Sequence, residues 1–382
     1  MAMTSRERLL GTMAGACTGY TPLCFLLLSE LRRQCADELE FAQRQVELGL
    51  DATVPLPDLP FEFHPAVETE VWLEPASPNS LLHKVYHTPA GDLETVVEKT
   101  PDWPHGDDIP VQSDFVIPRA RKFLVTEPAD LGPLAYLLPD ADAGAVAEFR
   151  RGAAEAQRFA EARGLATRAG FFRLSDFICW LCGCEQFAMM GPLNPDFFRA
   201  LIDMIARYQE RRIEILLEAR PDILCDAQWY ATTFLSPSLY EKFMEPALRR
   251  RADMAHASGA RFCVIATTNV LPFAPILKRL GVDVLFGVDP LQGGWDLGRA
   301  KKELGDQVCL WGGVNGYLTM VDGSPKDVEQ AVGEAMRALA PGGRFILAAV
   351  DNIRIDGSDT PEARQHVWRN VERLIETWRR LR

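Results

Sequence analysis

Residues 282–315 read VDVLFGVDPLQGGWDLGRAKKELGDQVCLWGGVN, and this stretch decides the fold. It begins with a short apolar run, 282–289, and closes with a second one, 307–315. Between the two runs, residues 295–304 have the spacing of an amphipathic helix. A strand, a helix and a second strand in this order predict a βαβ unit with parallel strands.

The same alternation extends along the chain. A helix is predicted over 324–339, with Ser324 as N-cap and Pro325 as its first residue. With the two runs above, the predicted strands number about eight, which is the number that closes a (β/α)8 TIM barrel. An open doubly wound sheet is the alternative, but no G-x-G-x-x-G follows the first strand. We expect one α/β domain over 1–382, its other strands lying at 51–56, 122–126, 165–172, 222–228, 260–269 and 344–352.

The N-terminal segment from about 57 to 120 does not fit the alternation. It is rich in proline, and HKVYHTPAGDLETVV (83–97) predicts a β-hairpin that turns at 89–91, Pro-Ala-Gly. We expect this segment to be an insertion that lies over the active face of the barrel.

Composition excludes several classes of function. The net charge of −12 argues against a nucleic-acid surface, which needs clustered Lys and Arg. The apolar run PLCFLLL (22–28) is too short to span a bilayer and lacks the layout of a signal peptide, so a short buried strand or helix is expected there. Nine cysteines without framework spacing predict a reduced, cytoplasmic protein. A homodimer is left open.

Polar side chains lie where the predicted strands end. In a TIM barrel the carboxyl ends of the strands form the catalytic face, so these side chains are candidates for an active-site floor. Any one of them could instead simply begin a loop. The set comprises Asp58, Asp226, Asn269, Asp289, Asn315, Asp351 and Asn352.

The chain resembles the uroporphyrinogen decarboxylase superfamily from about residue 5 to 380. The resemblance implies a (β/α)8 barrel, in agreement with the strand count. The segments that carry it are TSRERLLGTMAG (4–15), LGLDATVPLPD (48–58), DAQ (226–228), SPSLYEKFMEPALRR (236–250), FILAAVDNI (345–353) and TPEARQHVWRNVERLIE (360–376).

The superfamily has a decarboxylase branch and a branch of corrinoid-dependent methyltransferases. Tetrapyrrole decarboxylases hold propionate groups with arginines in a TPVW…MRQAGR signature, and here the matching stretch is TPLCFLLL (21–28). Leucine cannot rebuild an arginine–carboxylate clamp, so decarboxylation of uroporphyrinogen is not expected. Asp58 does fall where that branch has its catalytic aspartate.

The methyltransferase branch typically binds zinc through His-x-Cys at one strand end and Cys at a later one. Here Ala266 and Thr268 stand in the first two positions, and the third falls at about Asp351. A thiol-activating zinc site is therefore in doubt.

Ether-cleaving relatives, which transfer a methyl group from a methoxylated aromatic to cobalt(I), are implied instead. A Glu-x14-Glu-x20-His zinc pattern of such enzymes is matched by Glu47, Glu62 and His83. Glu47 precedes the strand at 51–56 and Glu62 follows it, so the strand would hold them roughly 20 Å apart. Glu62 and His83 remain candidate zinc ligands, and Glu47 is the weaker one.

Three functions follow. The first is transfer of a methyl group from an O-methyl or N-methyl donor to the cobalt of a separate corrinoid protein. The second is decarboxylation of a small, non-tetrapyrrole acid by Asp58, and the third is non-catalytic ligand binding. In the first, Asp58, Asp226 and Asp351 are the catalytic candidates, and the substrate-binding candidates are Trp229, Tyr230, Asn269, Asn315 and Asn352.

Overall fold

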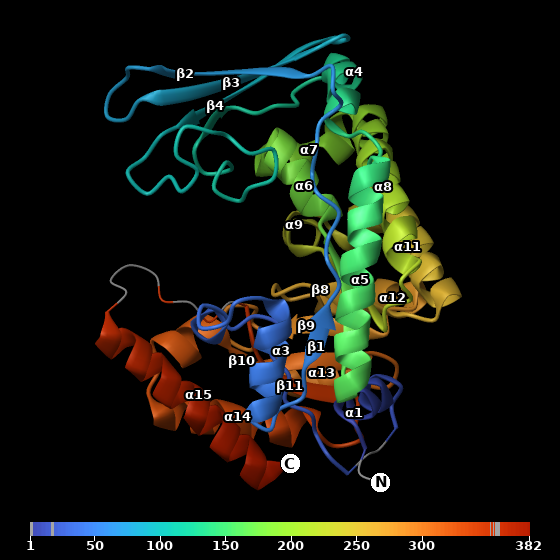
Figure 1. Cartoon of the computed structure of the whole chain (residues 1–382), viewed down its shortest axis with the longest axis vertical. Helices are drawn as coiled ribbons and strands as arrows, with labels where there is room; N and C mark the ends of the chain where they lie inside the picture. Colours follow the sequence, from blue (N-terminus) through green and yellow to red (C-terminus); the bar gives the residue numbers. More distant parts are fainter. Residues whose placement is uncertain (1–2, 17–18, 352, 354, 356–359) are drawn as a thin grey trace.

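The computed structural model describes residues 3–16, 19–351, 353, 355 and 360–382. Its centre is a curled sheet of seven strands in the order β1-β6-β7-β8-β9-β10-β11, and all neighbours run parallel. The sheet is TIM-barrel-like (Figure 1). Its strands are β1 (Thr53–Pro55), β6 (Ala166–Phe172), β7 (Ile223–Ala227), β8 (Arg261–Ile265), β9 (Val284–Val288), β10 (Cys309–Asn315) and β11 (Phe345–Val350).

The N-terminal apolar run occupies the gap between the two edge strands. Leu23 forms a parallel bridge with Leu347 of β11, where the Cys24 amide donates to the Leu347 carbonyl at 3.1 Å. On the other side, the amide of Asp51, just before β1, donates to the Leu23 carbonyl at 3.0 Å. The short run expected to be a buried strand or helix thus fills the eighth position of the barrel.

The strand predicted at 122–126 is not part of the barrel, which corrects the strand list. The chain forms β5 (Ala120–Lys122) instead, and β5 pairs antiparallel with a strand of a second sheet. Leu124 and Val125 are buried in the main core, and the Val125 amide bonds to the Leu181 carbonyl at 2.9 Å. The run is apolar because it packs under a helix.

The second sheet has the order β2-β3-β4-β5 and is antiparallel. Its other strands are β2 (Glu68–Glu74), β3 (Leu81–Thr88) and β4 (Gly91–Glu98). The predicted hairpin is confirmed, since Thr88 pairs with Gly91 across a two-residue turn. In Figure 1 this sheet lies at the far end of the two longest helices that rise from the barrel, α5 (Ala143–Arg163) and α8 (Pro195–Leu217).

Helices surround the barrel and cover its outer face. The predicted start of α14 (Pro325–Leu339) is confirmed, because the Ser324 side chain accepts from the Asp327 amide in a capping box. None of the described helices is long and apolar enough to cross a bilayer. The remaining helices are α1 (Ser5–Met13), α2 (Ser29–Arg32), α3 (Glu38–Glu47), α4 (Leu131–Leu134), α6 (Leu174–Cys182), α7 (Cys184–Leu193), α9 (Trp229–Phe234), α10 (Pro237–Phe243), α11 (Glu245–Ser258), α12 (Ala274–Leu280), α13 (Leu297–Leu304) and α15 (Pro361–Leu381).

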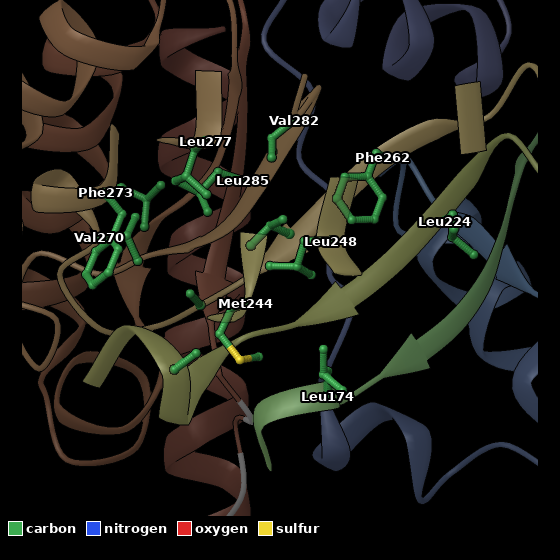
Figure 2. Close-up of a cluster of buried hydrophobic side chains, with 14 of the residues drawn as sticks. Leu174, Leu224, Met244, Leu248, Phe262, Val270, Phe273, Leu277, Val282 and Leu285 are labelled. Atoms are coloured by element: carbon green, nitrogen blue, oxygen red, sulfur yellow. The ribbon is translucent and has the colours of Figure 1, made fainter. Parts of the chain in front are cut away.

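Side chains alternate between two cores along each strand. In β7, Ile223, Cys225 and Ala227 point into the barrel, where they belong to a cluster with residues such as Trp311. The intervening Leu224 points outward and joins the larger core between strands and helices. Figure 2 shows part of this outer core, including Leu174, Leu224, Met244, Leu248, Phe262, Val270, Phe273, Leu277, Val282 and Leu285.

Candidate active site

A cavity of about 1050 Å³ lies at the carboxyl ends of β1, β6, β7 and β11. The loop between β4 and β5, residues 99–119, supplies part of its wall. A second cavity of about 220 Å³ shares five lining residues with it, so the two are neighbouring compartments. The residues in common are Asp58, Gln112, Phe171, Arg173 and Trp180.

Asp58 lies three residues beyond β1 and lines both compartments. Its carboxylate has no hydrogen bond or ion pair within the described part of the chain. Burial among protein atoms raises the pKa of Asp58, and the charges of Arg168, Arg173 and Arg212 offset this only in part. The residue is nevertheless solvent-accessible, as expected for an acid in the wall of an open cavity.

Two arginines of β6 and its C-terminal extension lie in the same cavity. Arg168 occupies an inward position of the strand, two residues after Ala166 of the barrel interior. Arg173 follows β6, and its guanidinium lies over the rings of Phe171 at 4.5 Å and Trp180 at 6.0 Å. Burial lowers the pKa of Arg173, which the negative charges of neighbouring carboxylates oppose.

Aromatic side chains form the remaining walls. Trp229, at the start of α9, lies 5.8 Å from Phe171 between ring centroids, and both line the cavity. The Trp180 indole N–H donates to Asp114 Oδ1 at 2.7 Å, and the Tyr230 hydroxyl donates to the same oxygen at 3.1 Å. The predicted substrate residue Tyr230 therefore holds a wall of the cavity, while Trp229 lines it directly.

Asp226, a predicted catalytic residue, does not line the cavity. It alternates with the inward residues of β7 and so points outward, where its carboxylate pairs with Arg251 of α11. Gln228 donates to its other oxygen, and Arg251 also donates to Gln209 at 2.7 Å. Both ends of the ion pair are at most 1% exposed. The structure thus gives Asp226 a fixed partner and no access to a ligand in this cavity.

The predicted amide ligands are also outside the cavity. Asn315 donates to Asp289 Oδ2 at 2.7 Å and to Gln292 at 2.8 Å, and its oxygen caps the following helical turn. Asn269 accepts from the Leu271 amide at 3.1 Å. These side chains organise the loops after β10 and β8.

Asp351 does line the cavity, in a left-handed backbone conformation with φ of 62°. Aspartate tolerates this conformation better than most residues. Asn352, the neighbouring candidate, lies outside the described residues.

The residues predicted to bind zinc do not fit a metal acting in this cavity. His83 lies in β3, where its ring nitrogens meet Glu94 at 3.1 Å and Glu74 at 2.9 Å, and its ring stacks on Trp72. No hydrogen bond or ion pair joins Glu62 to His83 among the described residues, and Glu47 ends α3 beside Arg44. Across the described ranges, no group of three His, Cys, Asp or Glu side chains is arranged to hold a metal ion. Zinc at Glu62 and His83 stays a prediction.

The guanidinium pair was missed by the sequence reasoning. Its signal is the alternation in ATRAGFFR (166–173), where Arg168 stands two residues after the inward Ala166. A charged side chain at an inward barrel position needs a polar partner or a ligand.

Comparisons with known proteins agree with this architecture. Residues 178–353 match the Uroporphyrinogen decarboxylase (URO-D) family. The structure of a methyltransferase from Methanosarcina mazei covers 99% of this chain and 99% of its own, with a TM-score of 0.61 at 17% identity.

Two further solved structures are less similar. A B12-independent methionine synthase from Shewanella sp. W3-18-1 has a TM-score of 0.43 at 10% identity and covers 60% of this chain and 66% of its own. A 3-keto-D-glucoside 4-epimerase from E. coli has a TM-score of 0.36 at 13% identity and covers 60% and 84%. Neither bears on the fold, and no curated protein matches the sequence. The family match is confined to residues 178–353, and the whole-chain likeness to the Methanosarcina mazei methyltransferase concerns the fold.

Proposed function

We propose that the chain is a methyltransferase that moves the methyl group of a methoxylated aromatic to the cobalt of a separate corrinoid protein. One observation carries the proposal: Asp58, an acid whose pKa is raised by burial, faces a large cavity walled by aromatic rings. The similarity in fold to a methyltransferase is consistent with it.

The chemistry of ether cleavage explains why such an acid is useful. When the methyl carbon passes to cobalt(I), the carbon–oxygen bond breaks and its electron pair stays on the phenolic oxygen. A carboxyl group with a raised pKa keeps its proton at higher pH and can deliver it to that oxygen. A quaternary ammonium donor leaves as a neutral amine and needs no such proton, so the acid favours an O-methyl donor over that class of N-methyl donor.

The cavity walls suit a flat aromatic donor. Phe171 and Trp229 provide ring faces and edges against which an aromatic ring packs favourably. Asp351 lies at the carboxyl end of β11 and lines the same space, where we assign it to orienting the donor.

The rim of the barrel offers apolar surface for the acceptor protein. Leu291 follows β9, and Tyr317 and Leu318 follow β10, and these side chains are exposed. Phe115, also exposed, lies in the cavity wall. Since the cobalt must come within bonding distance of the methyl carbon, the corrinoid protein has to dock over this end of the barrel.

The test is a methyl-transfer assay with the purified chain, 4-methoxybenzoate or methoxybenzene as donor, and free cobalamin reduced to cobalt(I) or a corrinoid protein as acceptor. We expect methylcobalamin absorbance and free phenol to appear in equal amounts. Absence of both products with every donor and acceptor would contradict the proposal.

Decarboxylation of a small acid is the second candidate, because Arg168 and Arg173 line the same cavity as Asp58. In that reaction the arginines would bind the acid and Asp58 would protonate the carbon that loses carbon dioxide. Release of carbon dioxide from the same donors, without methylation of the corrinoid, would favour it.

A further inference from the structure

Two positive charges in the cavity have no directly bonded counter-ion among the described residues. Arg168 and Arg173 both line it, yet neither side chain forms an ion pair or a hydrogen bond with any described residue. Other arginines of the barrel differ: Arg261 on β8 pairs with Asp283 at 3.0 Å, and Arg251 pairs with Asp226.

A buried donor atom distinguishes Arg168 from the other arginines that line the cavity. Arg168 Nε is buried without a hydrogen-bond partner. Among the described side chains with such an unsatisfied buried atom, Arg168 is the one that lines the main cavity. Leaving a buried donor unpaired costs free energy, so an acceptor oxygen is expected to reach it in the functional complex.

The acids of the cavity do not meet this need. Glu38 is paired with Arg32 at 2.6 Å, and Asp37 accepts from the Glu40 amide at the start of α3. Asp114 is held by Trp180 and Tyr230. Glu155 is exposed, and no bond joins it to either guanidinium within the part of the chain that is described.

Asp58 is near both arginines but bonded to neither. Burial raises the pKa of Asp58, and the charges of Arg168 and Arg173 offset part of this rise, so they lie close enough for electrostatic interaction although no ion pair forms. Three charged groups thus face one space that remains open between them. Asp114 and Asp176 also act on Arg173 through their charges, yet none of the described carboxylates bonds to either guanidinium, so the N–H donors remain available to a ligand carboxylate.

We infer that Arg168 and Arg173 form a carboxylate-binding subsite, so that the ligand of this cavity is an aromatic acid. The naming of that acid as a methoxylated donor rests on the proposed function; the subsite itself does not. Guanidinium groups bind planar carboxylates through paired N–H donors. The leucines at 26–28 have no such donors and cannot bind a carboxylate in this way.

The positions of these side chains also predict the orientation of a bound ligand. Arg173 lies over Phe171, and Phe171 lies beside Trp229. A ligand whose carboxylate reaches the arginines therefore places its ring against these aromatic side chains. A substituent on that ring then lies within the cavity that Asp58 lines.

Calorimetric titration of the full chain with 4-methoxybenzoate and with 4-methoxybenzamide tests the subsite without any corrinoid. The amide has nearly the same shape but no charge. We expect the carboxylate to bind about 10- to 100-fold more tightly, as hydrogen bonds to charged groups imply. Arg168→Gln and Arg173→Gln should each weaken carboxylate binding about tenfold or more and change amide binding less than about twofold.

Arg261→Gln is the matched control, since it makes the same substitution on a barrel strand outside the cavity. Melting curves confirm folding, and Arg173→Lys, which keeps the charge without the planar fork, should retain part of the affinity. Equal binding of amide and carboxylate by the wild type, or tighter binding of tetramethylammonium than of either, would overturn the inference.

The subsite and the proposed reaction fail separately. A carboxylate preference without methyl transfer to any acceptor would leave the subsite standing and reject the reaction. Equally fast methyl transfer from methoxybenzene and from 4-methoxybenzoate, without a carboxylate preference in binding, would leave the reaction standing and reject the subsite.

Discussion

Asp58 and Asp226 are both carboxylates at the ends of parallel strands, and their surroundings are opposite. Asp226 points out of the barrel and is enclosed with Arg251 as a bonded ion pair. Asp58 lies in the wall of an open cavity and faces two guanidiniums without bonding to them. A strand end alone therefore does not place a carboxylate in the cavity; the direction of its side chain does.

The two environments have different energetic consequences. A buried ion pair is costly to break, because the remaining charge is left unpaired in a region of low polarity. Charged groups that are desolvated and unpaired lower the stability of the free protein, and such groups concentrate at functional sites. Substitutions at Asp226 should thus act on folding, and substitutions at Asp58 on chemistry.

Asp58→Asn should give the largest effect. The amide keeps the shape but cannot deliver a proton, so kcat for methyl transfer should fall about 10²- to 10⁴-fold. Because the pKa of Asp58 is raised, the wild-type rate should decline as pH rises through that value, as the acid form is lost. Steady-state kinetics over pH check both, and unchanged kcat in Asp58→Asn would remove Asp58 from the mechanism.

Asp226→Ala should lower the free energy of unfolding by about 3–5 kcal/mol, because Arg251 is left buried without its counter-ion. Urea unfolding measures the loss. The double variant Asp226→Leu with Arg251→Met removes both charges and should recover most of the stability. A stable Asp226→Ala protein with no activity would instead make Asp226 a member of the site.

Asp176 allows a test of whether burial sets the pKa of a carboxyl group near the cavity. It is buried in the first turn of α6, and burial raises its pKa from 3.8 to about 7. Between these values the folded protein holds a proton that the unfolded chain releases, so this contribution to stability falls as pH rises from about 4 to about 7.

Asp176→Asn should remove that slope. Relative to the wild type, the variant should gain about 4 kcal/mol of unfolding free energy at pH 8 compared with pH 4. Melting temperatures across this range give the comparison. Parallel pH profiles for the two proteins would show that Asp176 does not titrate in this way.

His83→Ala should give the smallest effect on catalysis. The ring is held by Glu74 and Glu94 in β3, outside the cavity lining. We expect turnover to change less than about twofold and the zinc content of the purified protein to stay the same. Loss of both bound zinc and turnover in the variant would instead support a metal site at His83.

Sequence periodicity was sufficient for most of the barrel. The runs that became β7 to β11 are short, apolar and separated by helical spacing, and the Ser324 cap marks the start of α14. The eighth position was harder, because Leu23 takes it through a single bridge. Local pattern alone cannot tell such a segment from any other buried run, as the run at 122–126 also shows.

The site was predicted less completely. Asp58, Trp229 and Asp351 do line one cavity, since strand ends converge there. Asp226 and Asn315 do not, because a polar residue at a strand end can equally face outward or cap the next turn. The loop that brings Gln112 and Asp114 to the cavity lies far away in sequence, and no local pattern indicates that approach.

A crystal structure of the chain with bound 4-methoxybenzoate would show whether the two arginines hold the carboxylate. We expect both carboxylate oxygens within hydrogen-bond distance of Arg168 and Arg173, the ring against Phe171 and Trp229, and Asp226 still bonded to Arg251. A ligand bound away from the two arginines, or one contacted by Asp226, would contradict it.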